Sequence, residues 1–156
     1  MIKELLRKQI AFEYWSNVKI LASLNEAQPL DDRAQFLFAH ILNSSNMWLC
    51  RVVGSPMKTT LFQERTLENC EAFMNETAQG WSAFIATAND ADFDRIFQFV
   101  APIDGIERRI SVADAILHIS HHSSYHRGQI VARLKGSVEK LPFAMYMPFA
   151  GQIVNN

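Results

Sequence analysis

The segment His118-Ile-Ser-His-His-Ser-Ser-Tyr-His-Arg-Gly-Gln129 holds four of the five histidines of this 156-residue chain. Isoleucines recur around it at helical spacing, which indicates a helix with a buried face. Residues four apart on a helix differ by about 40° in direction and about 6 Å in height, so their side chains lie over one another. The row His118, His122 and His126 therefore offers two histidine pairs, and either pair can reach one metal ion.

Outward from this segment, three more stretches show apolar residues at helical spacing. We predict four helices, over residues 2–25, 31–53, 66–87 and 111–135. Asp31 and Thr66 are suitable N-caps, and Ser111 with Asp114 has the spacing of a capping box. Helices of about 22 to 26 residues with one apolar stripe each must bury those stripes against one another. The predicted fold is an all-α four-helix bundle forming one domain over residues 1–156.

The connections differ in length. Those between helices two and three and between helices three and four are too long for tight hairpins, so we expect long crossovers. Within the second connection Phe97, Phe99 and Ala101 alternate, and Asp104-Gly105 is a turn signal, which predicts a short β-hairpin. The apolar tail, residues 141–153, predicts a short fifth helix.

A helical histidine pair usually needs a third ligand from elsewhere. The only other histidine, His40, lies in the middle of the second helix among apolar residues, where an unpaired imidazole is costly to bury. Taken alone, a buried histidine is more often a hydrogen-bonded core residue, and the HxxxH spacing also occurs by chance. Together they predict a site for one divalent ion with ring nitrogens at about 2.0–2.2 Å. His121 points about 100° away from His122 and is expected at the surface.

Other site types are excluded by their patterns. The metalloprotease motif requires Glu after the first histidine, and di-iron bundles require Glu three residues before a histidine; neither occurs. The chain also lacks a GxSxG elbow and a glycine-rich phosphate loop. Three neutral imidazoles would leave the charge of the ion free to acidify a water or thiol at an open position.

The amino-acid composition limits the kinds of partner that we expect this protein to bind. Fifteen basic and 16 acidic residues give a net charge of -1 without a basic cluster, which argues against nucleic acid and against an anionic membrane. The amino-terminal stretch alternates charged and apolar residues and resembles no secretory signal. Cys50 and Cys70 have no CxxC spacing and are expected to be reduced thiols, so we expect a cytoplasmic protein.

The chain resembles the DinB-like family of bacterial proteins. The histidine segment ending in His126-Arg-Gly-Gln129 is similar to the family's HRGQ segment. Phe12-Glu-Tyr-Trp-Ser-Asn17 resembles a Tyr-Asn-x-Trp-Ala-Asn pattern, from which Phe12 and Glu13 depart. His40 followed by Trp48, and Trp81, suit the second and third helices. The tail departs from the family, since it lacks the Asp that often follows the proline-rich turn.

The resemblance implies that His40, His122 and His126 bind zinc, nickel or a similar ion, which leaves His118 beside the site. It also implies a homodimer, and some members transfer a low-molecular-weight thiol to a small-molecule electrophile. Our leading hypothesis is a metal-dependent enzyme for thiol transfer or hydrolysis. The alternative is a non-catalytic, stress-related protein in which the metal is structural or sensory.

Residues near the ligands complete the predicted site. Arg127 and Gln129 are polar neighbours of His126, and both could equally belong to a solvated face. Gly128 suggests close packing against another helix, because glycine within a helix costs about 1 kcal/mol relative to alanine. Trp15 and Asn17 lead us to expect the first helix as the wall of a substrate pocket, although packing alone could explain Trp15.

Overall fold

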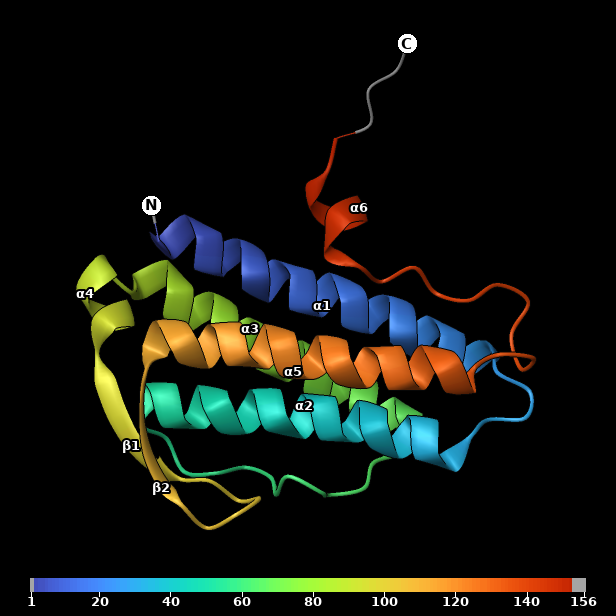
Figure 1. Ribbon diagram of the computed structural model, residues 1–156, viewed down its shortest axis with the longest axis horizontal. Coiled ribbons are helices and arrows are strands. Elements are labelled where there is room, and N and C mark those ends of the chain that lie inside the picture. Colours follow the sequence, from blue (N-terminus) through green and yellow to red (C-terminus); the bar gives the residue numbers. More distant parts are fainter. Residues whose placement is uncertain (1, 153–156) are drawn as a thin grey trace.

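Four long helices dominate the computed structural model, which describes residues 2–152 (Figure 1). They are α1 (Ile2–Glu26), α2 (Asp32–Val53), α3 (Leu67–Thr87) and α5 (Val112–Arg133). Smaller elements are α4 (Asp90–Asp94), β1 (Ile96–Val100), β2 (Glu107–Ser111) and α6 (Tyr146–Ala150). The predicted all-α four-helix bundle is confirmed, and each long helix lies within two residues of its predicted bounds.

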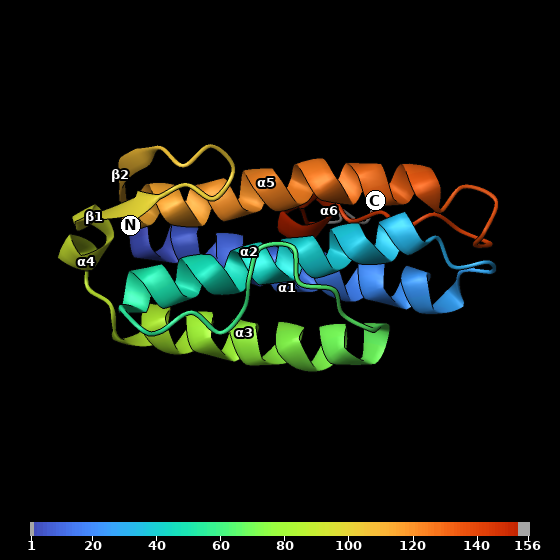
Figure 2. The same cartoon turned by 90° about the horizontal axis from the view of Figure 1, so that it is seen from below.

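The helices are not arranged simply up and down. Helices α1 and α5 run in one direction, and α2 and α3 run in the other, which requires the connection 54–66 to return along the side of the bundle (Figures 1 and 2). Helices α1 and α2 each pack against both α3 and α5. The longer connection, 88–111, stays at one end of the bundle, so the crossover predicted there is wrong. This connection carries α4 and the hairpin. Helices α2 and α5 therefore lie side by side and pack against each other.

Three predicted helix starts are confirmed by their capping bonds. The side chains of Asp31, Thr66 and Ser111 accept hydrogen bonds from the backbone N–H groups of Ala34, Asn69 and Asp114. The Asp114 carboxylate accepts a hydrogen bond from the Ser111 hydroxyl at 2.7 Å. Helix α2 ends as predicted at Gly54, whose φ of 72° is left-handed and suits glycine.

The predicted hairpin is also confirmed. Strands β1 and β2 pair antiparallel in a register that places Phe97 opposite Ile110 and Val100 opposite Glu107. Gly105, with φ of 70°, supplies the left-handed residue in the turn, and the Asp104 carboxylate accepts from the Ile106 N–H at 3.0 Å. The hairpin lies beside the amino-terminal half of α5 (Figure 2).

The core consists of two apolar clusters along the bundle. One surrounds Phe38, Leu24 and Ile130, and the other surrounds Trp81, Phe93 and Ile116. Each fully buried side chain of this size contributes about 1.5–3 kcal/mol through the hydrophobic effect. Within residues 2–152 no helix combines the length and the apolar character needed to cross a membrane.

One packing prediction is wrong. A Cβ atom built on Gly128 would meet nothing within 4 Å, so Gly128 is not a point of close helix contact. The close contact lies at Gly80 in α3 instead, where an added Cβ would come within 2.5 Å of Leu49 Cδ2. Gly128 is exposed on α5, and its neighbour Arg127 faces inward.

The tail forms one short helix, shorter than the stretch predicted. Helix α6 packs on α1 through aromatic rings, with 5.1 Å between the ring centres of Phe12 and Tyr146 and 5.5 Å between those of Trp15 and Phe149. The last residue of the predicted helix, Ile153, lies outside the described residues.

Candidate metal site

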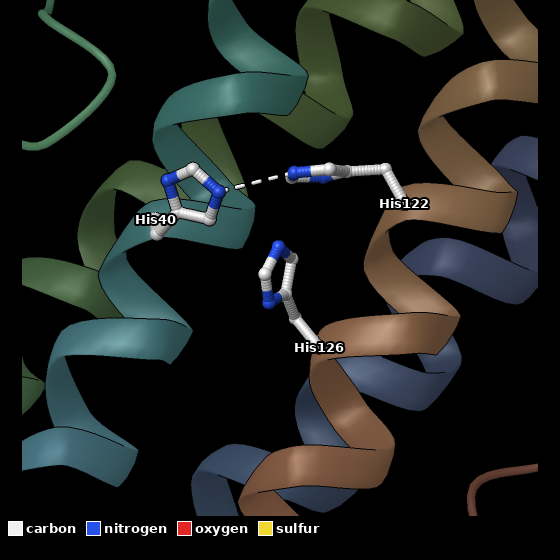
Figure 3. Close-up of side chains that lie close together, drawn as sticks. All are labelled: His40, His122 and His126. Atoms are coloured by element: carbon white, nitrogen blue, oxygen red, sulfur yellow. Dashed lines mark hydrogen bonds between the residues drawn. The ribbon is translucent and has the colours of Figure 1, made fainter. Parts of the chain in front are cut away.

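Three histidine side chains from two helices converge on one point between α2 and α5. His40 comes from α2, and His122 and His126 come from successive turns of α5 (Figure 3). One ring nitrogen from each lies within 4.8 Å of the others, and the Nε2 atoms of His40 and His122 are 3.0 Å apart. The four-residue spacing on α5 places both of its rings on the face turned toward α2.

Two of the rings are oriented by hydrogen bonds on the side away from this point. His40 Nδ1 lies 3.2 Å from the Leu61 carbonyl oxygen, and His126 Nδ1 lies 2.8 Å from Gln129 Oε1. Both partners are acceptors, so each Nδ1 carries the proton and each Nε2 keeps its lone pair. Metal-binding histidines are typically held in this manner.

The third ring is held differently. His122 Nδ1 is buried and has no hydrogen-bond partner among residues 2–152. Its ring stacks on His118, with 5.7 Å between ring centres, and meets the edge of His126 at 4.6 Å. Packing and the hydrogen bond between its Nε2 and that of His40 therefore orient His122, while the crossover connection and Gln129 orient the other two rings.

Burial keeps two of the three imidazoles, those of His40 and His122, neutral. Burial, followed by the neighbouring His126 and His40 rings, lowers the pKa of His122 to about 3. Burial also lowers the pKa of His40, against the opposing effect of its bond to Leu61. Because metals bind the neutral imidazole through a ring nitrogen, three converging ring nitrogens, two of them on rings kept neutral by burial, fit a divalent first-row ion. His40, His122 and His126 form a group that can hold such an ion.

A pocket of about 660 Å³ opens beside this group. Its lining comes from α2, α5, the connection 54–66 and the hairpin, and it is mainly apolar. Phe62 stacks on His40 almost in parallel, with 5.4 Å between ring centres. This volume lies in the range of small-molecule sites, so the histidines face a space able to admit a ligand.

Two of the other predicted site residues, His118 and Gln129, lie at the site. His118 lines the pocket one turn before His122 and packs on Trp48 at 5.2 Å. Gln129 contacts the site through its bond to His126. His121 is exposed on α5, as expected.

Arg127, Asn17 and Trp15 lie away from the pocket. Arg127 is buried between α5 and α1, donates to Glu13 at 2.9 Å and to Asn17 at 3.1 Å, and is therefore not part of a solvated face. Trp15 packs on Phe149 of α6. The prediction that α1 forms the wall of the pocket is wrong, because the pocket opens on the opposite side of α5.

Most residues that line the pocket were not predicted from the sequence, among them Arg51, Phe62 and Tyr125. Arg51 lies eleven residues after His40, about 20° from it around the helix, so the spacing was available as a signal. No periodicity could reveal Phe62, because it belongs to the irregular connection 54–66. Tyr125 precedes His126 and resembled an ordinary exposed residue.

The fold and site define a helical-bundle protein with a three-histidine group able to hold a metal ion. The chain belongs to the DinB family, whose model matches residues 32–145. A comparison with curated proteins gave no match.

Proposed function

We propose that this DinB protein is a metal-dependent enzyme that acts on a small molecule in the pocket beside His40, His122 and His126. Thiol transfer or hydrolysis is the proposed reaction, with zinc or nickel as the ion. The observation that carries the proposal is the pocket itself, since a metal used only to brace the bundle needs no cavity of about 660 Å³ at its ligands.

The residues at the site would have three different roles. The three imidazoles supply neutral nitrogen ligands, and a bound ion would acidify a thiol or water at a position they leave open. Trp48, Phe62 and Phe99 line the pocket with aromatic surface, which can bind an apolar substrate body and exclude water. Gln129 and the Leu61 carbonyl keep two of the rings in the productive tautomer.

Three wider features belong to the same proposal. The substrate is a small molecule rather than nucleic acid or membrane, and a low-molecular-weight thiol is the co-substrate for the transfer reaction. The protein acts in the cytoplasm, where reduced Cys50 and Cys70 are stable. It acts as a homodimer, as the family resemblance implies.

The test compares His126→Ala with His121→Ala, a matched control on the same helix whose ring is exposed outside the group. Both variants and the wild type are purified without a histidine tag. Metal content, melting temperature and turnover are then measured in a screen of thiols with electrophilic acceptors and of hydrolysable esters and amides. We expect His126→Ala to lose metal and turnover with a modest fall in melting temperature, and His121→Ala to match the wild type.

Two results would overturn the proposal. A metal-free wild type that cannot be loaded with zinc or nickel would remove the site. Global unfolding of His126→Ala, combined with a wild type inactive throughout the screen, would favour the structural role, because ion binding would then be part of the folding free energy.

A further inference from the structure

Arg51 is a cation in the pocket of the three histidines. It lies in the last turn of α2, is partly buried and lines the same cavity as His40, His118 and His122. The eleven residues from His40 to Arg51 correspond to three helical turns, or about 16 Å along α2. The two residues therefore lie on nearly the same face of the helix, at separate positions along it.

The guanidinium group of Arg51 has no anionic partner in the structure. No carboxylate, carbonyl or hydroxyl oxygen of residues 2–152 forms an ion pair or hydrogen bond with it. The other arginine lining the pocket, Arg108, is neutralised by Asp104, with 2.6 Å between nitrogen and oxygen. Arg51 is thus the lining cation whose donors remain free for a ligand.

Aromatic rings hold this free cation in place. The guanidinium carbon lies 4.9 Å from the ring centres of both Trp48 and Phe99. Burial lowers the pKa of Arg51, which means that the charged form is partly desolvated without a counter-charge. The carboxyl end of a helix favours cations, which can explain an exposed arginine there. It does not explain why this arginine is packed on two rings inside a pocket.

We propose that Arg51 binds the carboxylate end of an elongated substrate whose apolar body lies along the aromatic lining and whose reacting end lies at the histidines. Arginine binds carboxylates through two parallel N–H donors, a geometry that fixes orientation as well as charge. The inference rests on the proposed function in one respect only: the substrate is taken to occupy this pocket.

The test uses two probes of the same shape, 4-phenylbutyrate and its neutral amide 4-phenylbutyramide. Binding of each is measured by titration calorimetry to metal-loaded wild type and to Arg51→Met, Arg51→Lys and Arg109→Met. Arg109 is the matched control, since it is exposed on β2 outside the pocket and its loss changes the net charge equally. His126→Ala is included because a carboxylate could also bind the ion directly.

We expect the wild type to prefer the carboxylate by about tenfold, as a charge-assisted hydrogen bond in a partly desolvated site allows. The preference should vanish in Arg51→Met, persist in part in Arg51→Lys, and remain in Arg109→Met and His126→Ala. Melting curves show whether Arg51→Met is folded, and the lysine variant tests the proposal if it is not.

Contrary outcomes separate the two proposals. Equal binding of both probes to the wild type, or a preference unchanged in folded Arg51→Met, would overturn the role of Arg51 and leave the enzyme proposal intact. A preference lost in His126→Ala but kept in Arg51→Met would place the carboxylate at the ion and overturn the inference. Retained preference for the carboxylate in a protein without turnover would support Arg51 while the proposed reaction fails.

Discussion

Two of the three histidines are held by hydrogen bonds that leave a ring nitrogen ready to bind a cation. His40 and His126 each use Nδ1 to donate to an oxygen, which leaves both Nε2 lone pairs for the site. His122 lacks such a bond and owes its neutral state to burial, which lowers its pKa to about 3. Because a buried neutral imidazole takes up protons less readily than an unfolded one, the metal-free fold loses stability as pH falls from about 6.5 toward 3.

The pH dependence of metal binding follows from the same shifts. Three unperturbed histidines, with pKa values of about 6.5, would give a steep loss of metal below about pH 6. With the pKa values of His122 and His40 lowered, we expect the loss to begin at lower pH and to involve fewer than three protons. A metal titration from pH 5 to 8, corrected for protonation of the competing chelator, measures this. A three-proton slope starting near pH 6.5 would contradict it, and a flat profile would exclude histidine ligands.

His118 provides the comparison between a ligand and its neighbour. It stacks on His122, but it does not belong to the group of three converging nitrogens. We expect His118→Ala to weaken metal binding by less than about tenfold and His122→Ala by more than about a hundredfold. Gln129→Ala, which releases His126 Nδ1, should fall between them. Metal affinity measured by chelator competition gives the order of the three variants. A loss in His118→Ala equal to or larger than that in His122→Ala would show that the pair His118 and His122 binds the ion.

Elements with a local signal were predictable from the sequence. Asp31, Thr66 and Ser111 start helices because their side chains satisfy amides a few residues away, and Asp104-Gly105 turns the hairpin for a similarly local reason. The convergence of His40 with histidines of α5 was also predictable, because few other partners could satisfy a buried imidazole. The choice of His122 and His126 over His118 came from the family resemblance.

Features that depend on the packing of distant elements were not predictable. The Arg127–Glu13 ion pair joins residues 114 positions apart, and nothing in the period of either helix assigns them to each other. Once Arg127 is recognised as buried against α1, the side of α5 facing α1 is closed and the pocket must open on the α2 side. The error over α1 has this origin, whereas Arg51 was missed although its spacing from His40 on the same helix was available as a signal.

The glycines of α3 and α5 give opposite predictions for alanine substitution. Gly128 is exposed and its Cβ direction is empty, so Gly128→Ala should raise the free energy of unfolding by about 1 kcal/mol through helix propensity. Gly80→Ala must displace the buried Leu49 side chain and should lower the free energy of unfolding by about 1–3 kcal/mol. Urea denaturation of both variants measures the difference. Destabilisation by Gly128→Ala would mean that another surface packs against this side of α5.

At the scale of the whole molecule, the site lies at the edge of the core. The two apolar clusters run through the bundle, and one of them reaches the pocket through Trp48. The site lies between α2 and α5 on the side covered by the crossover connection and the hairpin (Figure 2). The crossover contributes directly to the site, since the Leu61 carbonyl orients His40 and Phe62 stacks on it. The unusual helix order thus places an irregular segment against the proposed ligands.

The position of the site at the edge of the core predicts the effect of removing the metal. Because contacts among apolar side chains hold the two clusters together, chelation should leave the helical circular-dichroism signal almost unchanged. The free energy of unfolding should fall only by the contribution of ion binding. This contribution is about 3–4 kcal/mol if the free ion was present at 100 to 1,000 times its dissociation constant. For a chain of this size, that loss corresponds to a fall in melting temperature of roughly 6–16 °C. Melting curves at several ion concentrations should show the midpoint rising with the logarithm of free metal and approaching the metal-free value at the low end. Complete loss of helical signal on chelation would show instead that the bundle requires its ion to fold, and the catalytic role proposed for the site would lose its structural basis.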